Sequence, residues 1–240
     1  MRLNYRQLIK TGLHRTGFDL VRIKNNPNQT LLGLKTRPIR TIIDVGANTG
    51  QFAQMISRFF PNAALHCFEP LPGPFAQLEK WAKSQHGRVV VYNLAIGDCD
   101  IETEMYLHKN HTPSSSFLPT TRLNEQYYPF TKEQNRIMVM QKKLDTALEK
   151  AQASFASEVL IKLDVQGYEN RVITGGNKVF SEASACIVEV CLDRLYEDQA
   201  RFPELLMMLS NFGYRYVGNL NQAYAADGHV VYLDAIFIRH

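Results

Sequence analysis

Short apolar runs rich in β-branched residues alternate along the chain with stretches in which apolar residues recur at helical spacing. The runs that predict strands are 40–45, 63–68, 88–96, 159–165, 185–192, 214–217 and 230–239. Amphipathic helices are expected after Gly50, from Pro74, near Tyr168 and over 203–212. This alternation of strands and helices predicts an α/β domain with a parallel sheet covered by helices.

Two segments interrupt the alternation. Residues 1–37 combine helical spacing between Tyr5 and Leu13 with a loop around Pro27, which predicts a helical extension and linker ahead of a main domain at 38–240. Whether this extension covers a site, packs on the sheet or mediates a dimer stays open. From about 100 to 157 the chain changes to short alternating runs and a polar loop, which indicates an insertion into the domain.

The composition is that of a folded domain in water. The 240 residues are 45% hydrophobic and 21% charged, and no run approaches the roughly 18 apolar residues that a membrane-spanning helix requires. Basic residues interrupt the apolar positions of the first twenty residues, which argues against a secretory signal. We therefore expect a cytoplasmic protein with no membrane span.

The cysteines and the net charge give no indication of a metal site, a disulfide framework or a nucleic-acid-binding protein. The four cysteines form no CxxC pair and three lie in or beside apolar runs, which predicts reduced core thiols. The formal charge is +4, but the basic residues are spread out and the densest run is Lys142-Lys143, so no nucleic-acid partner is expected. The oligomeric state is not predicted, and a homo-oligomer stays an open alternative.

The turn after the first expected strand carries the strongest signal for ligand binding. It reads Asp44-Val-Gly46-Ala-Asn48-Thr-Gly50 between a β-branched strand and an amphipathic helix, as a nucleotide-binding turn does. The glycines let the backbone approach a ligand closely, and Asn48 tolerates a positive φ. Glu69 ends the next strand 25 residues after Asp44, where a carboxylate can accept hydrogen bonds from both ribose hydroxyls. Together these features predict an adenosine site.

Two features of this turn favour S-adenosylmethionine over NAD. The glycine spacing is GxxxG and not GxGxxG, so the glycine that brings strand and helix together in dinucleotide-binding turns is absent. A carboxylate at Asp44 would repel a diphosphate but attract the ammonium of a methionine moiety. Asp98, after the third expected strand, either binds the adenine amino group or forms a simple turn with Gly97.

Several ordered motifs resemble the FkbM family of methyltransferases. They are DVGANTGQF at 44–52, FEP at 68–70, AIG at 95–97, IKLDVQGYE at 161–169 and LDAIFIR at 233–239. The resemblance covers roughly Ile39 to the C-terminus. It implies a Rossmann-like class I methyltransferase fold, in which a mainly parallel seven-stranded sheet has an antiparallel last strand, helices on both faces and S-adenosylmethionine at the carboxyl ends of its first strands. Family members resemble O-methyltransferases of sugars, polysaccharide precursors or secondary metabolites, so the acceptor itself is not implied.

The turn and these motifs define the expected cofactor-binding residues. They are Asp44, Gly46, Ala47, Asn48, Gly50, Phe52, Glu69, Pro70, Ala95, Gly97, Asp98 and Asp164. Asp164 lies at the carboxyl end of the strand expected over 159–165, where ligands of open α/β sheets bind, so it is also the first candidate for catalysis at the acceptor. An N-cap for the following helix is the alternative role.

A lysine inside the apolar run before Asp164 needs a partner. Lys162 lies two residues earlier on the same face of the strand, where a lysine must find a carboxylate or carry a depressed pKa. Glu189, on the strand expected alongside, is the predicted partner in a structural ion pair. Glu189 is also included among the candidate substrate-binding residues.

Other polar residues are expected near the acceptor. His108, His111 and Ser115 belong to the polar part of the insertion, which can fold over the acceptor, and His111 is the candidate base; a solvated loop is the alternative. Glu169 either holds substrate or interacts with a helix dipole. Asp234 starts the last strand, whose beginning lies at the ligand-binding edge if that strand is antiparallel. No paired carboxylate motif demands a metal.

The sequence therefore predicts an S-adenosylmethionine-dependent O-methyltransferase for a small-molecule or glycan acceptor. An NAD-dependent oxidoreductase and a non-catalytic cofactor-binding or assembly protein of the same fold are the alternatives. The sequence contains no NPPY or DPPY run for methylation of an exocyclic amine and no Pro-Cys dipeptide for attack on cytosine, which disfavours nucleic-acid methylation.

Overall fold

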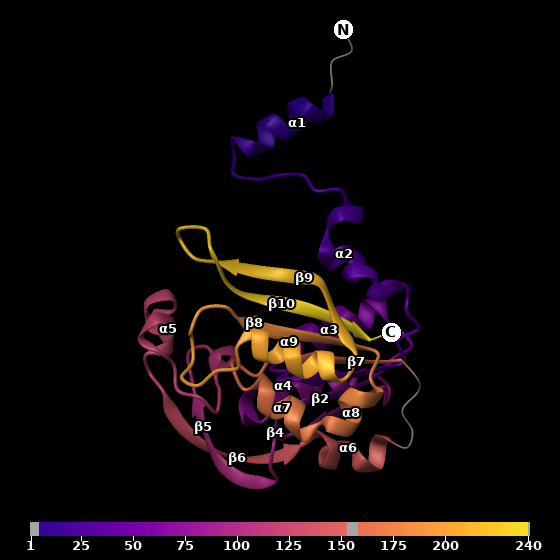
Figure 1. The fold of residues 1–240 in the computed structure, drawn as a ribbon, viewed down its shortest axis with the longest axis vertical. Helices are drawn as coiled ribbons and strands as arrows, with labels where there is room; N and C mark the ends of the chain where they lie inside the picture. Colours follow the sequence, from indigo (N-terminus) through magenta and orange to yellow (C-terminus); the bar gives the residue numbers. More distant parts are fainter. Residues whose placement is uncertain (1–4, 153–157, 240) are drawn as a thin grey trace.

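The computed structural model describes residues 5–152 and 158–239, and a seven-stranded sheet forms their centre (Figure 1). In spatial order its strands are β3 (Val89–Tyr92), β2 (Ala64–Phe68), β1 (Thr41–Val45), β7 (Val159–Leu163), β8 (Ala185–Cys191), β10 (Val230–Arg239) and β9 (Tyr214–Tyr224). Neighbouring strands from β3 to β8 are parallel, whereas β10 is antiparallel to both β8 and β9. The expected mainly parallel, seven-stranded sheet with an antiparallel last strand is confirmed.

Helices cover both faces of this sheet, as the sequence predicted (Figure 1). One face carries α3 (Gln51–Phe59) and α4 (Pro72–Lys83), and the other carries α6 (Leu144–Gln152), α7 (Glu169–Gly175), α8 (Asn177–Glu182) and α9 (Phe202–Asn211). Strand side chains alternate between the faces, so Ile42 of β1 packs in a cluster with Ile56 of α3, while Ile43 packs in a cluster with Val172 of α7. Because both faces are covered, β1 and β7 are buried along their whole length.

The N-terminal segment contains the expected helix, α1 (Tyr5–His14), which stands away from the sheet (Figure 1). The chain then returns to the domain through α2 (Pro27–Thr30) and the 3-10 helix η2 (Leu31–Thr36). Leu31 and Leu34 are fully buried in the core on the α3 face, and Asn28 Nδ2 donates to Asn221 Oδ1 of β9 at 2.7 Å. Of the alternatives left open by the sequence, packing on the sheet therefore describes residues 27–36.

The segment expected as an insertion forms a small second sheet. β4 (Ala95–Gly97) pairs parallel with β6 (Asn135–Lys143), and β6 pairs antiparallel with β5 (Ile101–Leu107). Between β5 and β6 lie η3 (Thr112–Ser114), α5 (Arg122–Tyr127) and η4 (Pro129–Thr131). Helix α6 packs with α8 in the main core, and residues 153–157, where the expected insertion ends, lie outside the described residues.

The single strand expected over 88–96 is divided between the two sheets. Its first part is β3 of the main sheet and its last part is β4 of the small sheet. Asn93 separates them, because its Nδ2 donates to the carbonyl oxygens of Glu69 at 3.0 Å and Pro70 at 2.9 Å and ties the chain to the segment after β2. The expectation of one strand was wrong because the apolar pattern continues across this turn.

Candidate functional site

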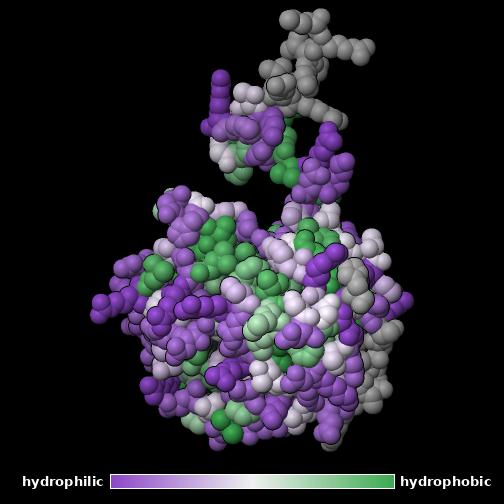
Figure 2. All heavy atoms as spheres, viewed as in Figure 1, coloured by the Kyte–Doolittle hydropathy of each residue, from purple (hydrophilic) through white to green (hydrophobic). Residues whose placement is uncertain are grey.

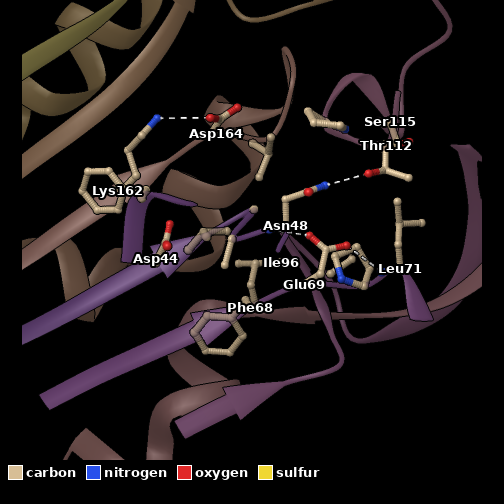
Figure 3. Close-up of a pocket in the computed structure, with 18 of the residues that line it drawn as sticks. Asp44, Asn48, Phe68, Glu69, Leu71, Ile96, Thr112, Ser115, Lys162 and Asp164 are labelled. Atoms are coloured by element: carbon tan, nitrogen blue, oxygen red, sulfur yellow. Dashed lines mark hydrogen bonds and ion pairs between the residues drawn. The ribbon is translucent and has the colours of Figure 1, made fainter. Parts of the chain in front are cut away.

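A cavity of about 400 Å³ lies at the carboxyl ends of β1, β2 and β7 (Figure 3). Residues 44–48, at the end of β1 and in the turn that follows, form one wall, and residues 68–71, at the end of β2 and after it, form another. The insertion contributes Thr112 and Ser115, and Asp164 contributes from the loop after β7. We call this space the strand-end cavity; it occupies the edge at which ligands of open α/β sheets bind.

The turn after β1 depends on residues that accept a positive φ. Gly46, Asn48 and Gly50 have φ values of +82°, +46° and +89°, which confirms the expected conformation of Asn48. A Cβ atom on Gly46 would lie 1.9 Å from the carbonyl oxygen of Asp164. Glycine at position 46 therefore allows the turn to lie directly against the loop after β7.

Asp44, the penultimate residue of β1, is a buried acidic residue with an unused acceptor. Its side chain lines the strand-end cavity, yet Oδ2 has no hydrogen-bond partner among the described residues. Burial raises the pKa of Asp44 to about 7, and the charge of nearby Lys162 offsets only part of this rise. An unpaired buried carboxylate oxygen is costly, so this position suits a ligand that brings a cation or a donor.

Glu69 is held by the backbone at the end of β2. Its Oε2 accepts from the backbone N–H of Asn48 at 2.9 Å, and its Oε1 accepts from that of Leu71 at 2.7 Å. Burial raises the pKa of Glu69 to about 7, although these two hydrogen bonds lower it. Each oxygen keeps lone-pair capacity, so the fixed carboxylate presents a bidentate acceptor to the cavity.

The other candidate cofactor residues divide into two groups. Those that line the strand-end cavity are Gly46, Ala47, Asn48, Phe52, Pro70, Ala95 and Asp164. Gly50, Gly97 and Asp98 do not line it. Gly50 is the N-cap of α3. Asp98 follows β4, which belongs to the small sheet and not to the main sheet, and its Oδ2 accepts from Arg171 Nη1 of α7 at 3.0 Å. Asp98 thus forms an ion pair outside the cavity.

The sequence reasoning missed an apolar wall of the strand-end cavity. Its side chains are Met55, Leu71, Leu94, Ile96 and Met105. The sequence signal that could have indicated this wall was Ile96, which belongs to the AIG motif. Met105 comes from β5 and reaches the cavity only through the pairing of the strands in the small sheet. A wall of this kind suits the flat face of a purine.

Lys162 is buried between two carboxylates, neither of which is the predicted partner. Its Nζ donates to Asp234 Oδ1 at 3.0 Å and to Asp164 Oδ2 at 3.4 Å. Burial would lower the pKa of Lys162, but the charges of Asp164 and Asp234 outweigh it and raise this pKa. The expected pair with Glu189 is not formed, because Glu189 Oε1 accepts from Gln166 Nε2 instead.

A second cavity, of about 300 Å³, adjoins the first. The two share Pro113 and Asp164 in their walls. The second cavity also contains Glu189 and the aromatic side chains His111, Tyr128, Phe130, Tyr196 and Tyr232, and we call it the aromatic cavity. Burial raises the pKa of Glu189 well above its usual range. A molecule bound in the aromatic cavity would therefore lie next to a ligand in the strand-end cavity, with Asp164 at their boundary.

Gln166 is a site residue that the sequence reasoning missed. It has a φ of +57°, its Nε2 donates to Asp164 Oδ1 at 2.8 Å, and its Oε1 accepts from the hydroxyl of Tyr196 at 2.6 Å. The same amide donates to Glu189, so one side chain connects the two acidic residues of the aromatic cavity. The signal available in the sequence was the Gln166-Gly167 pair two residues after Asp164, which is typical of a sharp turn at a strand end.

The candidate residues of the insertion have different positions. His111 lines the aromatic cavity, where its Nδ1 lies 2.9 Å from Ser114 Oγ and its ring lies 4.6 Å from that of Phe130. Ser115 lines the strand-end cavity, and its Oγ accepts from the backbone N–H of His108 at 3.1 Å. The side chain of His108 is buried and lines neither cavity, and neither ring nitrogen has a hydrogen-bond partner among the described residues.

Two other acidic candidates differ in their access to a ligand. Glu169 is buried outside both cavities, where its Oε1 accepts from the backbone N–H groups of Val165 and Gly167, each at 3.2 Å. Burial raises its pKa to about 7. Asp234 lines the strand-end cavity, and its position at the ligand-binding edge follows from the antiparallel direction of β10. Glu169 thus shapes the loop after β7, and Asp234 reaches the cavity.

Other expectations concern metal ligands, cysteines and membrane-spanning helices. Within 5–152 and 158–239, no cluster of three or more His, Cys, Asp or Glu residues is arranged to hold a metal ion. Cys67, Cys186 and Cys191 are buried free thiols, as predicted, and Cys99 is also free. No helix in these ranges is long and apolar enough to cross a membrane.

A seven-stranded sheet of this strand order, with an antiparallel last strand and helices on both faces, defines a class I methyltransferase fold. The family model described as "Methyltransferase FkbM domain" matches residues 44–216. The chain belongs to this family and is therefore a methyltransferase, as the ordered motifs had indicated.

Two named relatives and one solved structure are similar to this chain. The 2-O-methyltransferase NoeI of Sinorhizobium fredii (strain NBRC 101917 / NGR234) is 26% identical over 77% of this chain and 77% of its own length. The 31-O-demethyl-FK506 methyltransferase FkbM of Streptomyces tacrolimicus is 24% identical over 80% of this chain and 79% of its own length. The crystal structure of an FkbM methyltransferase from Methylobacillus flagellatus KT has a TM-score of 0.51 at 12% identity, covering 84% of this chain but 44% of that one.

Proposed function

We propose that this protein is an S-adenosylmethionine-dependent O-methyltransferase that acts on a hydroxyl of a small-molecule or glycan acceptor: a sugar, a polysaccharide precursor or a secondary metabolite. The observation that carries the proposal is the pair of carboxylates, Asp44 and Glu69, at the adjacent ends of β1 and β2 in one cavity. Two carboxylates in the wall of one cavity suit a ligand that has a cationic tail and a ribose, and the cavity volume of about 400 Å³ lies within the range of small-molecule sites.

The residues of the strand-end cavity match the parts of this cofactor. The unpaired Oδ2 of Asp44 would accept from the ammonium of the methionine moiety. The fixed carboxylate of Glu69 would accept from the ribose hydroxyls, and the apolar wall around Ile96 would contact the adenine. The bound cofactor would supply an electrophilic methyl group on a sulfonium. An NAD-dependent oxidoreductase is not favoured, because Asp44 faces the cavity where a diphosphate would be repelled.

The aromatic cavity is the proposed acceptor site. It adjoins the strand-end cavity at Asp164, and its tyrosine rings and Glu189 offer stacking surfaces and hydrogen-bond partners to a hydroxylated ring. Asp164 and His111 are the candidate bases for the acceptor hydroxyl. Correct positioning of the acceptor oxygen can contribute about 7–11 kcal/mol, more than a general base does. The O-methyltransferase names of both relatives support oxygen as the methylated atom.

Calorimetry with S-adenosylmethionine and S-adenosylhomocysteine tests the cofactor assignment. Glu69→Ala is expected to weaken the binding of both ligands at least tenfold. The reason is that hydrogen bonds to a charged group contribute about 1.5–3 kcal/mol. The matched control is Glu79→Ala, which removes an exposed glutamate of α4 that pairs with Lys83. Unchanged affinity in Glu69→Ala would overturn the proposal.

Methyl transfer from labelled cofactor to a panel of hydroxylated sugars and lipids tests the reaction, with the methylated atom identified by NMR. Replacing the true base, by Asp164→Asn or His111→Ala, is expected to lower kcat by about 10²–10⁴. Glu189→Gln should raise the KM for the acceptor and leave cofactor affinity unchanged, because Glu189 lines only the aromatic cavity. Products methylated on nitrogen or carbon alone would contradict the O-methyltransferase assignment.

A further inference from the structure

Residues 5–24, here called the N-terminal arm, carry an unusual number of exposed apolar side chains. The arm consists of α1, the loop that follows it and the first two residues of the 3-10 helix η1 (Ile23–Asn25), and it projects from the domain (Figure 1). Ile9, Phe18, Leu20, Val21 and Ile23 are all more than half exposed, with Ile23 at 75% and Phe18 at 68%. Figure 2 shows this projecting part with hydrophobic and hydrophilic atoms side by side. Such a surface is costly in water unless something covers it.

The arm also carries the whole net charge of the chain. It contains five basic residues and one acidic residue, a net charge of +4, which equals the formal charge of all 240 residues. Of 27 basic and 23 acidic residues in the chain, the remainder outside the arm therefore contains 22 of each sign. The basic residues are Arg6, Lys10, Arg15, Arg22 and Lys24. The arm is thus a basic segment attached to a domain without net charge.

Local contacts bring two of the basic side chains beside three of the apolar ones. Asp19 Oδ1 lies 3.3 Å from Lys10 Nζ and 2.9 Å from His14 Nε2, which holds the stretch after α1 against the helix. Ile9, Leu20 and Val21 then share a groove with Lys10 and Arg22. Apolar side chains interleaved with basic ones are the pattern that binds at a membrane interface, with the apolar groups at the acyl boundary and the cations at lipid phosphates.

We propose that the N-terminal arm docks this protein on the surface of a bilayer that contains anionic lipids. A nucleic acid would match the charge but would leave Phe18, Val21 and Ile23 in water. A second copy of the arm would cover the apolar side chains but would bring two net charges of +4 together. An anionic bilayer satisfies both features, and the arm lies on the surface without crossing it. This inference is independent of the proposed cofactor and acceptor.

Co-sedimentation of the full-length protein with lipid vesicles tests the docking. We expect binding to vesicles of phosphatidylcholine with phosphatidylglycerol, weak or no binding to phosphatidylcholine alone, and a loss of binding as salt is raised. Phe18→Ser/Ile23→Ser should lower the partition coefficient about tenfold or more, because both side chains would be buried at the acyl boundary. Arg15→Gln/Arg22→Gln should lower it about fivefold for each charge removed.

Matched variants on the domain distinguish docking by the arm from non-specific binding of the protein to vesicles. Met138→Ser/Met207→Ser removes two exposed apolar side chains, and Arg58→Gln/Lys178→Gln removes two exposed charges, all outside the arm. Both controls should bind vesicles as the unchanged protein does, and circular dichroism should show all variants folded. Equal binding to neutral and anionic vesicles, no binding to either, or binding unaffected by the arm variants would overturn the proposal. So would a dimer in sedimentation velocity that Phe18→Ser/Ile23→Ser dissociates, since a second copy would then cover the arm.

Discussion

Asn48 donates from Nδ2 to Oγ1 of Thr112 at 3.1 Å and so joins the turn after β1 to the insertion (Figure 3). The same asparagine has its backbone N–H bound to Glu69, and its Oδ1 accepts from the backbone N–H of Thr49. Asn48 therefore connects the turn both to Glu69, the residue proposed to bind the ribose, and to the loop that contributes Thr112 to the strand-end cavity. The insertion helps to form the strand-end cavity, because Thr112 belongs to the cavity wall.

Removal of this link should weaken cofactor binding. Thr112→Val keeps the shape of the side chain but loses the hydroxyl, and it should raise the Kd for S-adenosylmethionine about two- to tenfold, the effect of one hydrogen bond. Calorimetry measures the change. The control is Thr174→Val, which removes a hydroxyl of the exposed Thr174 of α7, a residue that does not line the cavity. Equal affinity in the two variants would mean that the loop does not depend on Asn48.

The pH dependence of cofactor binding should report the ionisation of Asp44 and Glu69. Burial raises the pKa of each to about 7 in the ligand-free protein. Below that pH the carboxyls are protonated and neutral, so binding of a cationic tail must release a proton. Affinity should therefore rise with pH, by up to about tenfold per pH unit for each group, and level off above about pH 7.

The contribution of Asp44 can be isolated with a second ligand. S-adenosylhomocysteine carries the ammonium that Asp44 would bind, whereas 5′-methylthioadenosine keeps the ribose and adenine and lacks that group. The pH slope of the first ligand should exceed that of the second, and Asp44→Asn should remove the difference. If both ligands gave the same slope in the unchanged protein, Asp44 would not be the residue that binds the ammonium.

Gly46 should tolerate no side chain. Its φ is positive, and a Cβ atom at this position would lie only 1.9 Å from the Asp164 carbonyl oxygen, so the backbone must move in Gly46→Ala. We expect the free energy of unfolding to fall by about 2 kcal/mol or more, measured by urea denaturation. Gly73→Ala is the control, because Gly73 lies in the first turn of α4 and a Cβ atom there would have no atom within 4 Å. Similar losses in both variants would show that the close approach is not what fixes Gly46.

Local patterns predicted most of the fold. The turn from Asp44 to Gly50 and the apolar runs before and after it specify β1, α3 and β2 within a residue or two, because buried strands and amphipathic helices have periods that can be read locally. The break at Asn93 could not be predicted in this way, since it depends on carbonyl groups of the segment after β2. The small sheet is likewise a product of long-range pairing between β5 and β6.

The site was predictable where strand ends define it. Asp44, Glu69 and Asp164 each lie within one residue of the end of a parallel strand, so the sheet alone brings them to one edge. The aromatic cavity was not predictable, because Tyr128 comes from the insertion and Tyr232 from the last strand. Their meeting depends on how the insertion packs on the sheet, and no local period encodes that packing.

The partner of Lys162 also depended on tertiary structure. Two carboxylates on β8 and β10, Glu189 and Asp234, face each other in the antiparallel register, and both stand near the lysine. Only the side-chain contacts distinguish them: Lys162 donates to Asp234, while Glu189 accepts from Gln166. The free energy of unfolding should therefore depend on the pair of Lys162 with Asp234 more than on Glu189.

Lys162→Met should therefore lower the free energy of unfolding by about 3–5 kcal/mol, because it leaves buried carboxylates without their cation. In a double-mutant cycle measured by urea denaturation, Lys162→Met and Asp234→Asn should show a coupling energy of about 0.5–3 kcal/mol, since the second change removes the charge that the first leaves unpaired. The matching cycle with Glu189→Gln should give a much smaller coupling. A larger coupling with Glu189 than with Asp234 would restore the ion pair that the sequence predicted, and would contradict the contacts of Lys162 described above.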